Sequence, residues 1–367
     1  MERINNSKKE LILVTGGAGF IGSHLVQALL ERGYSVRVLD NLSPPTHDGT
    51  LPPWFPKEAE FIKGDVRDKE DWTRALDGVS FVFHLAAYAD VHPDFHTYFE
   101  VNNGGTALMY EVIVERKLPV RKIIAASSQS VYGEGKYICS VHGIEYPPPR
   151  SKSQLSRGEW EVVCPVGNEA MEVVFEKEDD ELHPVIPYGI SKAALEKIVL
   201  GLGKLYDIPS VVVRYSIAHG SQQSFRHYNS GALRSFVAMA LLKEDFIFHE
   251  DGMQTRDFVN VRDVTSAHLL LLNDPRADFQ VFNIGMGKPT KIIDLLKKVA
   301  EVMDVPFRPK PRGKFRFLAP RHSPMDVSKL KSLGWSPHYT LEDNVRDYVS
   351  WVKNQPEAKR YFHFAFK

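Results

Sequence analysis

The feature that most constrains the fold of this chain is the glycine-rich segment Gly16–Gly22, which lies between a strand-like run and a helical pattern. The apolar run Leu11–Val14 precedes the segment, and apolar residues at helical spacing follow it. In such a turn Gly16 allows the tight bend, Gly19 lets the backbone approach a pyrophosphate, and Gly22 allows close packing of helix on strand. The segment predicts a strand–turn–helix unit whose helix points its amino end at phosphate.

Strand-like runs and helical patterns alternate along most of the chain, which predicts the α/β class. We expect a Rossmann-like, doubly wound parallel sheet with a smaller C-terminal substrate-binding lobe. The expected divisions are a nucleotide-binding domain over 1–190 with an insertion at about 134–186, a part shared by both lobes over 191–275, and mainly the C-terminal lobe over 276–367. The predicted elements include strands at Val36–Leu39, Phe81–His84, Lys122–Ala125, Val211–Arg214 and Val281–Ile284, and the amphipathic helix Ile292–Met303.

An acidic residue ends the second predicted strand and selects between two dinucleotides. Asp40 stands eighteen residues beyond Gly22. A carboxylate at this place accepts hydrogen bonds from a ribose 2′-hydroxyl and repels a 2′-phosphate, which favours NAD over NADP. The alternative is a structural glycine turn followed by a surface aspartate, and the order of strand, turn, helix and acid makes it the weaker interpretation.

Composition excludes several other functions. Lys+Arg and Asp+Glu both number 46 among the 367 residues, so no net charge attracts nucleic acid or an anionic membrane. No apolar run approaches the roughly 18 residues that span a bilayer, and the polar amino-terminal segment lacks an apolar signal region. The two cysteines, Cys139 and Cys164, cannot form a disulfide framework, so we expect a cytoplasmic protein.

Tyr188 and Lys192 stand four positions apart at the start of a predicted helix and so share one of its faces. An ammonium beside the phenol would lower the tyrosine pKa from about 10 and make it a general base. The same spacing also occurs on solvated helix faces. The serine-rich segment Ser127–Ser130 ends a predicted strand at the ligand-binding edge of the sheet, where a hydroxyl would orient a substrate alcohol or merely satisfy loop amides.

Taken together, these segments resemble the extended short-chain dehydrogenase/reductases, and within them the NAD-dependent sugar-nucleotide epimerase/dehydratase family. The similarity covers nearly the whole chain and also includes Gln254–Val259 and Phe282–Gly285. Arg214–Ile217 and Gln222–Phe225 are most similar to bacterial 4-epimerases acting on UDP-hexoses or dTDP-6-deoxyhexoses. The resemblance implies a catalytic set of Ser128, Tyr188 and Lys192, and cofactor contacts from Gly16, Gly19, Phe20, Ile21, Asp40, Asn41, Asp65, Val66, Leu85, Ala86, Ala87, Asn102, Tyr188, Lys192 and Tyr215.

The resemblance also implies a reaction in carbohydrate metabolism, such as polysaccharide biosynthesis. Tyr188 would take a proton from a sugar hydroxyl while hydride passes to NAD, and return of hydride to the other face of the ketone would invert the carbon. Dehydratases of the family place an Asp-Glu pair directly after the catalytic residue, where this chain has Gln129 and Ser130. Neither exchanges protons near neutral pH, so we predict epimerisation rather than dehydration. The resemblance further implies that C4 is the inverted carbon and that Ser130 contacts the substrate.

Three arginines are candidates for the substrate diphosphate, because a guanidinium matches phosphate oxygens. They are Arg256, Arg316 and Arg321, and each has the alternative of a surface ion pair. The chain departs from the family at Ile217, where many members have Asn, and at Arg316–Ala319, where Arg-x-Gly-Asp is usual. These departures put the identity of the nucleotide base in doubt.

The insertion lengthens the Tyr132–Tyr188 spacing to 56 positions. It contains Cys139-x-x-His142 and Cys164-Pro-Val-Gly167, which resemble a paired zinc knuckle with glycine in place of the last cysteine. Because structural zinc takes four donors and one is missing, we expect a metal-free hydrophobic flap over the sugar pocket, and zinc bound by Cys139, His142 and Cys164 is the alternative.

Two rival functions remain open from the sequence. A dehydrogenase or reductase of the same fold would exchange its cofactor, whereas an epimerase retains NAD through many turnovers. A non-catalytic nucleotide-binding protein would not need Ser128, Tyr188 and Lys192. By analogy with similar enzymes, we expect a homodimer formed by the helix of Tyr188 and the helix near Asn102.

Overall fold

The computed structural model describes residues 10–90, 92–226 and 231–363. Its centre is a seven-stranded sheet in the order β13-β9-β5-β4-β1-β2-β3, with every neighbouring pair parallel. The order reverses between β1 and β4, which is the doubly wound topology. The strands are β1 Leu11–Thr15, β2 Ser35–Asp40, β3 Glu60–Lys63, β4 Phe81–His84, β5 Lys122–Ser128, β9 Ser210–Tyr215 and β13 Val281–Ile284.

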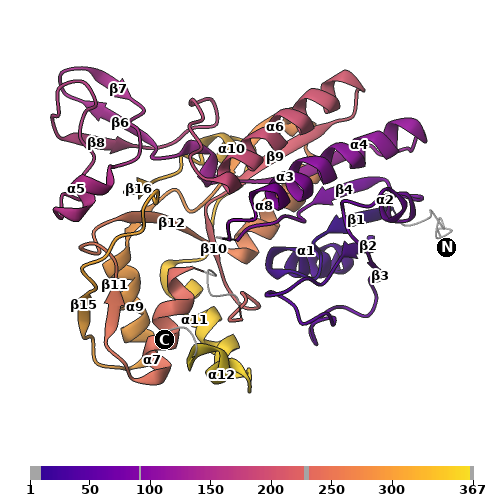
Figure 1. The fold of residues 1–367 in the computed structure, drawn as a ribbon. Helices are drawn as coiled ribbons and strands as arrows, with labels where there is room; N and C mark the ends of the chain where they lie inside the picture. The colour runs from indigo at the N-terminus through magenta and orange to yellow at the C-terminus, as the bar shows by residue number, and fades with distance from the viewer. Residues whose placement is uncertain (1–9, 91, 227–230, 364–367) are drawn as a thin grey trace.

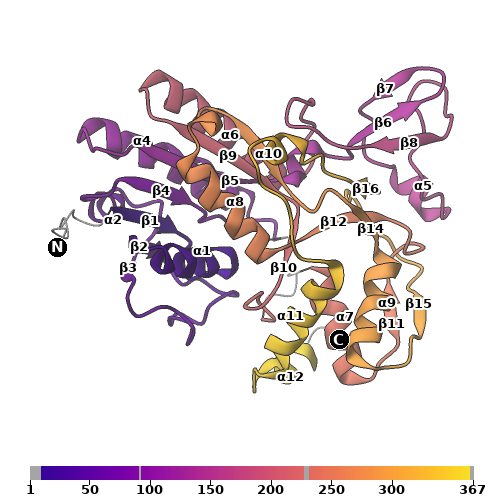
Figure 2. The ribbon, with the colours of Figure 1, turned by 180° about the vertical axis from the view of Figure 1, so that it is seen from behind.

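Helices cover both faces of this sheet, and the strands are accordingly rich in buried Val, Ile and Leu (Figures 1 and 2). One face is covered by α1 (Phe20–Glu31) and α8 (Val261–Asn273). The other is covered by α2 (Lys69–Ala75), α4 (Gly105–Glu115) and α6 (Pro187–Leu205). Short helical pieces connect these layers: α3 Phe95–Phe99, the π-turn Glu100–Gly104, the 3-10 turns Gln129–Tyr132 and Pro275–Ala277, and α10 Ser328–Ser332.

The C-terminal lobe has its own apolar core, formed mainly by helices packed beside short strands. Figure 1 shows this lobe beside the sheet, with α7, α9 and α11 grouped together. Its helices are α7 Ala232–Leu242, α9 Ile292–Met303, α11 Leu341–Lys353 and α12 Ala358–His363, and the strands beside them are β10 Ile217–His219, β11 Phe246–Phe248, β12 Thr255–Asn260, β14 Pro289–Lys291, β15 Pro309–Pro311 and β16 His322–Ser323.

The insertion is a small antiparallel unit that projects from the body on the side away from α1 (Figures 1 and 2). It comprises β6 (Lys136–Cys139), β7 (Gly143–Glu145) and β8 (Met171–Val174), with β6 in the middle, and the short helix α5 (Lys152–Ser156). A buried ion pair between Arg150 Nη1 and Glu250 Oε2, at 3.0 Å, joins it to the C-terminal lobe.

The fold class predicted from the sequence is confirmed, and helix α9 has its predicted bounds. Two details differ. The edge strand β3 has no counterpart among the predicted strands, because only four half-exposed residues form it. Strand β13, which lies within 276–367, forms an edge of the central sheet, and helix α10 packs against it. No helix among the described residues is long and apolar enough to cross a membrane.

Candidate active site

A cleft of about 510 Å³ opens at the carboxyl edge of the central sheet, where the strand order reverses. Ligands of open α/β sheets bind at such a point. The turns after β1, β2 and β4 form one end of the cleft, and the ends of β5 and β9 with Tyr188 form the other. Predicted residues that line it are Gly16, Gly19, Phe20, Ile21, Asp40, Asn41, Asp65, Val66, Leu85, Ala86, Ala87, Ser128, Tyr188 and Tyr215.

The glycine turn closes in the way its sequence predicts. Gly16 has φ +68°, and a Cβ on it would lie 2.8 Å from the backbone nitrogen of Ala86. A Cβ on Gly22 would collide with the Gly16 carbonyl and lie 2.7 Å from the Cα of Gly17. Gly19 lines the cleft and precedes α1, whose first N–H groups have no side-chain cap. Unshared N–H groups at a helix amino end form an anion site, so this end of the cleft fits a pyrophosphate.

Asp40 lies beside the glycine turn, as its position after β2 predicts. Its Oδ2 accepts a hydrogen bond from the Ala18 backbone nitrogen at 3.1 Å, and its Oδ1 accepts one from Leu42 at 2.9 Å. Each carboxylate oxygen keeps a further lone pair for ribose hydroxyls. The next acid along the edge, Asp65, accepts hydrogen bonds from Arg67 and Asn41, and Arg67 is the main cause that holds its pKa at about 2.

Ser128 and Tyr188 meet at the opposite end of the cleft. Ser128 ends β5, and its Oγ accepts hydrogen bonds from the Ser130 backbone nitrogen at 3.2 Å and from Ser130 Oγ at 3.0 Å. Its own hydroxyl hydrogen bonds to Tyr188 and lowers the pKa of that phenol. Ser130 is absent from the cleft lining, so in this structure it orients Ser128.

Burial is the dominant influence on the Tyr188 phenol and raises its pKa to about 12. The Lys192 ammonium, which was expected to lower that pKa, lies 5.9 Å from the centre of the tyrosine ring and is itself buried. Burial lowers the Lys192 pKa to about 7, and Glu196 opposes this shift. The Lys192 Nζ donates to the Ala126 carbonyl at 2.7 Å, which fixes the side chain behind Tyr188.

A third residue on the same face of α6 completes the wall behind the site. Glu196 follows Lys192 by one turn and accepts two hydrogen bonds from Arg214 of β9, at 2.9 and 2.7 Å. Its Oε1 also accepts from Ser127 Oγ at 2.6 Å. Glu196 was not among the predicted site residues, although its spacing of four from Lys192 was a usable signal. This buried network ties α6 to the strands that carry Ser128 and Tyr215.

Asn102 lies behind the cleft wall and does not line it. Its side chain holds both the N–H and the C=O of Tyr88, at 2.8 and 3.1 Å, and donates to Ser191 Oγ at 2.9 Å. It therefore fixes the loop after β4 against α6. The Tyr215 hydroxyl hydrogen-bonds His268 Nε2 at 2.7 Å, which fixes its ring at the floor of the cleft.

The three candidate phosphate arginines have different surroundings. Arg316 is exposed. Arg256 is partly buried and donates to the carbonyls of Thr255, Pro320 and Arg321, which uses three of its five N–H groups. Arg321 is fully buried and is bound by Glu161, Glu250 and Asp251. This arrangement argues against the expected phosphate role for Arg321, because acidic partners already surround its guanidinium.

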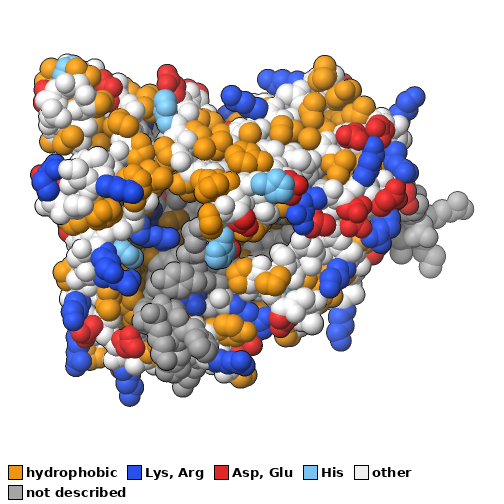
Figure 3. All heavy atoms as spheres, in the orientation of Figure 1, with side chains coloured by type: hydrophobic (Ala, Val, Ile, Leu, Met, Phe, Trp, Pro, Cys, Tyr) orange, Lys and Arg blue, Asp and Glu red, His pale blue; other side chains and the backbone are white. Residues whose placement is uncertain are grey.

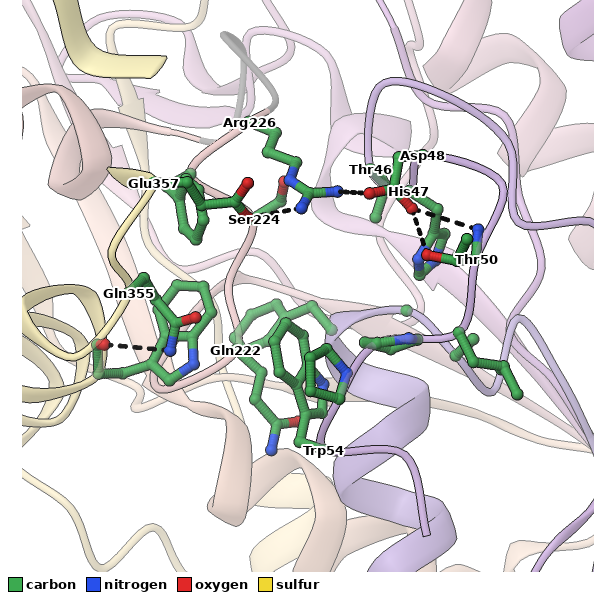
Figure 4. Close-up of a pocket in the computed structure, with 18 residues that line it drawn as sticks. Thr46, His47, Asp48, Thr50, Trp54, Gln222, Ser224, Arg226, Gln355 and Glu357 are labelled. Atoms are coloured by element: carbon green, nitrogen blue, oxygen red, sulfur yellow. Dashed lines mark hydrogen bonds and ion pairs between the residues drawn. The ribbon is translucent and has the colours of Figure 1, made fainter. Parts of the chain in front are cut away.

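A second cavity, of about 190 Å³, adjoins the amino end of α1 (Figure 4). It lies between the loop after β2, the segment 222–226 and the residues after α11. Figure 4 shows Arg226 reaching between Asp48 and Glu357, with ion-pair distances of 3.1 and 2.5 Å. This bridge joins the loop after Asp40 to the C-terminal lobe.

The described residues fit a dinucleotide along the whole cleft. The positive-φ glycine turn, the uncapped helix and the Asp40 carboxylate would hold pyrophosphate and ribose, and Tyr188 with Ser128 stands at the far end. Residues that the sequence analysis did not assign to the cleft also line it, including Thr46, Ser216, Gln223 and Ser224. They lie in loops, where no periodic pattern marks them.

The chain belongs to the NAD-dependent epimerase/dehydratase family, whose sequence profile matches residues 12–154 and 163–285. Among its relatives, the dTDP-L-rhamnose 4-epimerase of Burkholderia thailandensis is 31% identical over 95% of this chain and 96% of its own length. A putative UDP-glucose 4-epimerase of Methanocaldococcus jannaschii is 32% identical over 94% of this chain and 99% of its own length. The predictions of family and of NAD as cofactor are confirmed.

Solved structures agree with this assignment. The UDP-glucose 4-epimerase of Thermotoga maritima with UDP-glucose has a TM-score of 0.76 at 30% identity, and 94% of this chain and 98% of that one are covered. The Thermus thermophilus UDP-glucose 4-epimerase with NAD has a TM-score of 0.73 at 29% identity, covering 94% and 99% of the two chains. The protein is an enzyme of this NAD-dependent group.

Proposed function

We propose that this enzyme inverts C4 of a nucleotide-linked sugar through a 4-keto intermediate. The observation that carries the proposal is the hydrogen bond between Ser128 and Tyr188 at the end of the dinucleotide cleft, without an acid–base pair beside it. The two positions after Ser128 hold Gln129 and Ser130, and Ser130 is engaged with Ser128. Oxidation and reduction of an alcohol need one proton-transfer group, and Tyr188 supplies it.

Each residue of the site has a defined task in this reaction. Tyr188 takes the proton of the C4 hydroxyl as a phenolate and returns it to the alkoxide in the second half of the reaction. Ser128 donates a hydrogen bond to the reacting oxygen atoms, and Lys192 is held behind the phenol by its hydrogen bond to the Ala126 carbonyl. Bound NAD supplies the acceptor for the C4 hydrogen and the source of its return. No net oxidant or reductant is consumed.

The substrate class in this proposal is a UDP- or dTDP-linked hexose. Support comes from two relatives, of which one is named for a dTDP-sugar and the other for a UDP-sugar. We assign the diphosphate to Arg256, which keeps part of its guanidinium free of protein carbonyls, and to the exposed Arg316. Glu134 lies near Arg256 and is buried, which raises its pKa to about 7 and reduces competition with phosphate for the arginine.

The test is incubation of purified enzyme, without added cofactor, with UDP-glucose, UDP-glucuronate, UDP-N-acetylglucosamine and dTDP-rhamnose in separate reactions. Proton NMR then follows the stereochemistry at C4. We expect one of these sugars to reach an epimer mixture without net formation of NADH. An oxidised sugar accumulating in step with NADH would contradict the proposal and favour a dehydrogenase.

The matched control is Tyr188→Phe, which removes the proton-transfer group and keeps the ring. We expect kcat to fall by about 10² to 10⁴-fold while the bound NAD content stays the same. Full activity of this variant would remove Tyr188 from the proposed role. An equal loss of NAD would show that the substitution damages the cleft rather than the chemistry.

We also propose a cytoplasmic homodimer formed through α3, α4 and α6. Phe95 and Phe99 of α3 and Ile190 of α6 are 56%, 40% and 41% exposed, and these helices contact one another. Exposed aromatic and aliphatic side chains on neighbouring helices are typical of an interface. Light scattering should give twice the chain mass of 41.6 kDa, and Phe99→Glu should give one chain mass. A wild-type protein of one chain mass would contradict the dimer.

A further inference from the structure

Four potential metal ligands converge at the tip of the insertion, far from the cleft. They are Cys139, His142, Cys164 and Glu169, and one donor atom from each lies within 4.8 Å of the others. Both cysteines are buried, at 2% and 0% exposure, while His142 and Glu169 close the site from the solvent side. Two thiols, an imidazole and a carboxylate are all ligands that Zn²⁺ accepts.

Four of the six distances between these donors lie near the edge lengths of a zinc tetrahedron. His142 Nδ1 lies 3.5 Å from Cys139 Sγ and 3.4 Å from Cys164 Sγ. Glu169 Oε2 lies 3.9 Å from Cys139 Sγ and 3.7 Å from His142 Nδ1. Zinc–ligand bonds of about 2.0 to 2.3 Å at tetrahedral angles give edges of roughly 3.3 to 3.8 Å. The other two distances are no longer than 4.8 Å, so modest side-chain movements would bring all four atoms within bonding distance of one zinc ion.

Two tight turns present the ligands. The first joins β6 to β7 and carries Cys139 and His142 before Gly143, which has φ +82°. In the second, the Asn168 nitrogen donates to the Cys164 carbonyl at 2.9 Å, and the Cys164 nitrogen donates to the Glu169 carbonyl at 2.8 Å. The two turns thus face each other as a pair, each closed by its own backbone hydrogen bonds.

Glu169 occupies the place of the donor that the sequence lacks. A Cβ built on Gly167 would lie 2.6 Å from the Glu169 carboxyl carbon and would collide with both carboxylate oxygens. The glutamate thus fills the space that a side chain at 167 would take. The sequence lacks a fourth donor at Gly167, and the fold brings this donor from two residues further along the chain.

The insertion contains little apolar core of its own that could stabilise it. None of its residues from 136 to 174 belongs to the four buried apolar clusters formed by the described residues. Several of its apolar side chains are exposed instead, and Figure 3 shows hydrophobic side chains over this part of the surface. Small units with little core are commonly held by a metal or by disulfides.

We propose that Cys139, His142, Cys164 and Glu169 bind one structural Zn²⁺. Binding replaces the two thiol protons, so two protons leave as two Zn–S bonds form, and neutral His142 and ionised Glu169 complete four-coordination. The ion joins the β6–β7 turn to the segment before β8. It thereby fixes the insertion, whose Arg150 and Glu161 bind Glu250 and Arg321 of the C-terminal lobe.

The test measures metal directly in the full-length enzyme. We expect about one zinc per chain by elemental mass spectrometry after purification without chelator, and visible absorption of tetrahedral, thiolate-bound Co²⁺ after exchange. Glu169→Ala should weaken Zn²⁺ binding, measured by competition with a chromophoric chelator, by at least roughly tenfold. Glu172→Ala, which removes an exposed carboxylate from the neighbouring strand, should leave the affinity unchanged.

The double variant Gly167→Cys with Glu169→Ala is the most discriminating test of the fourth ligand. Because the new thiol would enter the space that the glutamate leaves, we expect it to restore affinity to at least the wild-type level. Absence of zinc from wild-type enzyme with both thiols reduced would overturn the proposal, as would a Cys139–Cys164 disulfide in enzyme purified under reducing conditions. Unchanged affinity in Glu169→Ala would overturn the assignment of the fourth ligand. Retained NAD would show that each variant is folded.

Discussion

The two ends of this molecule hold charge in different ways. In the cofactor half, the anion site consists of backbone N–H groups at the start of α1, and the Asp40 carboxylate beside them adds selectivity. In the half formed by the insertion and the C-terminal lobe, Arg150 and Arg321 are buried among Glu161, Glu250 and Asp251. The anion site of the first half depends on open space beside backbone N–H groups. The charge cluster of the second half depends on opposite charges that distant segments bring together.

This difference predicts which substitutions each half tolerates. An anion site made of backbone N–H groups loses binding when a side chain is added beside it, whereas a buried charge cluster loses stability when one charge is removed. Arg321→Met and Gly22→Ala test that contrast directly, whereas Glu196→Gln and Ser128→Ala test how far the catalytic end of the first half also depends on buried polar pairs.

Arg321→Met should destabilise the enzyme by about 4 kcal/mol, because it leaves the buried Glu250 carboxylate with one fewer cation. Thermal unfolding measures the change. Arg316→Met is the matched control: Arg316 is exposed, so stability should change by less than about 0.5 kcal/mol while KM for the nucleotide sugar rises. The contrast fails if Arg321→Met unfolds at the wild-type temperature and only KM changes.

Glu196→Gln should cost about 3 kcal/mol, because the carboxylate that pairs with buried Arg214 loses its charge. The same change removes the anion beside Lys192 and should lower the pKa of that ammonium further. Chemical denaturation and the pH profile of kcat report the two effects separately. A variant as stable as wild type would show that this network contributes nothing to holding α6 on the sheet.

Gly22→Ala should cost about 1 to 3 kcal/mol and reduce the retained NAD, because the new Cβ meets the Gly16 carbonyl. Gly201→Ala, in α6, is the control, since no atom lies within 4 Å of the Cβ position there. Alanine at that position should be neutral or stabilising by up to about 1 kcal/mol. Full NAD content in Gly22→Ala would contradict the steric account of the turn.

Ser128→Ala should shift the pH dependence of kcat. Tyr188 is active as a phenolate, so activity is lost as the pH falls through its pKa. The Ser128 hydrogen bond lowers that pKa against the effect of burial, so its removal should move the acidic limb to higher pH. Ser130→Ala should give a smaller shift in the same direction, because Ser130 only orients Ser128. An acidic limb of the kcat profile at the wild-type pH would show that Ser128 does not influence the pKa of Tyr188.

Features that are local along the chain could be predicted from the amino-acid sequence. The glycine turn, Asp40 at the end of β2, and Tyr188 with Lys192 one helical turn apart follow from the geometry of one strand or helix. For the same reason the fold class and the parallel arrangement of the strands could be predicted. The predicted pKa effect of Lys192 on Tyr188 did not appear, because burial depends on everything packed around the pair.

Contacts between segments far apart in the sequence became known only from the fold. Arg321 has the same formal charge as Arg256 and Arg316, yet folding places it among carboxylates from two other segments. Asn102 fixes the loop after β4 from behind the cleft wall, and the Glu169 carboxylate fills the space beside Gly167. Side-chain type sets what a residue can bind, whereas the partner it meets depends on how separate elements pack, which no local pattern records.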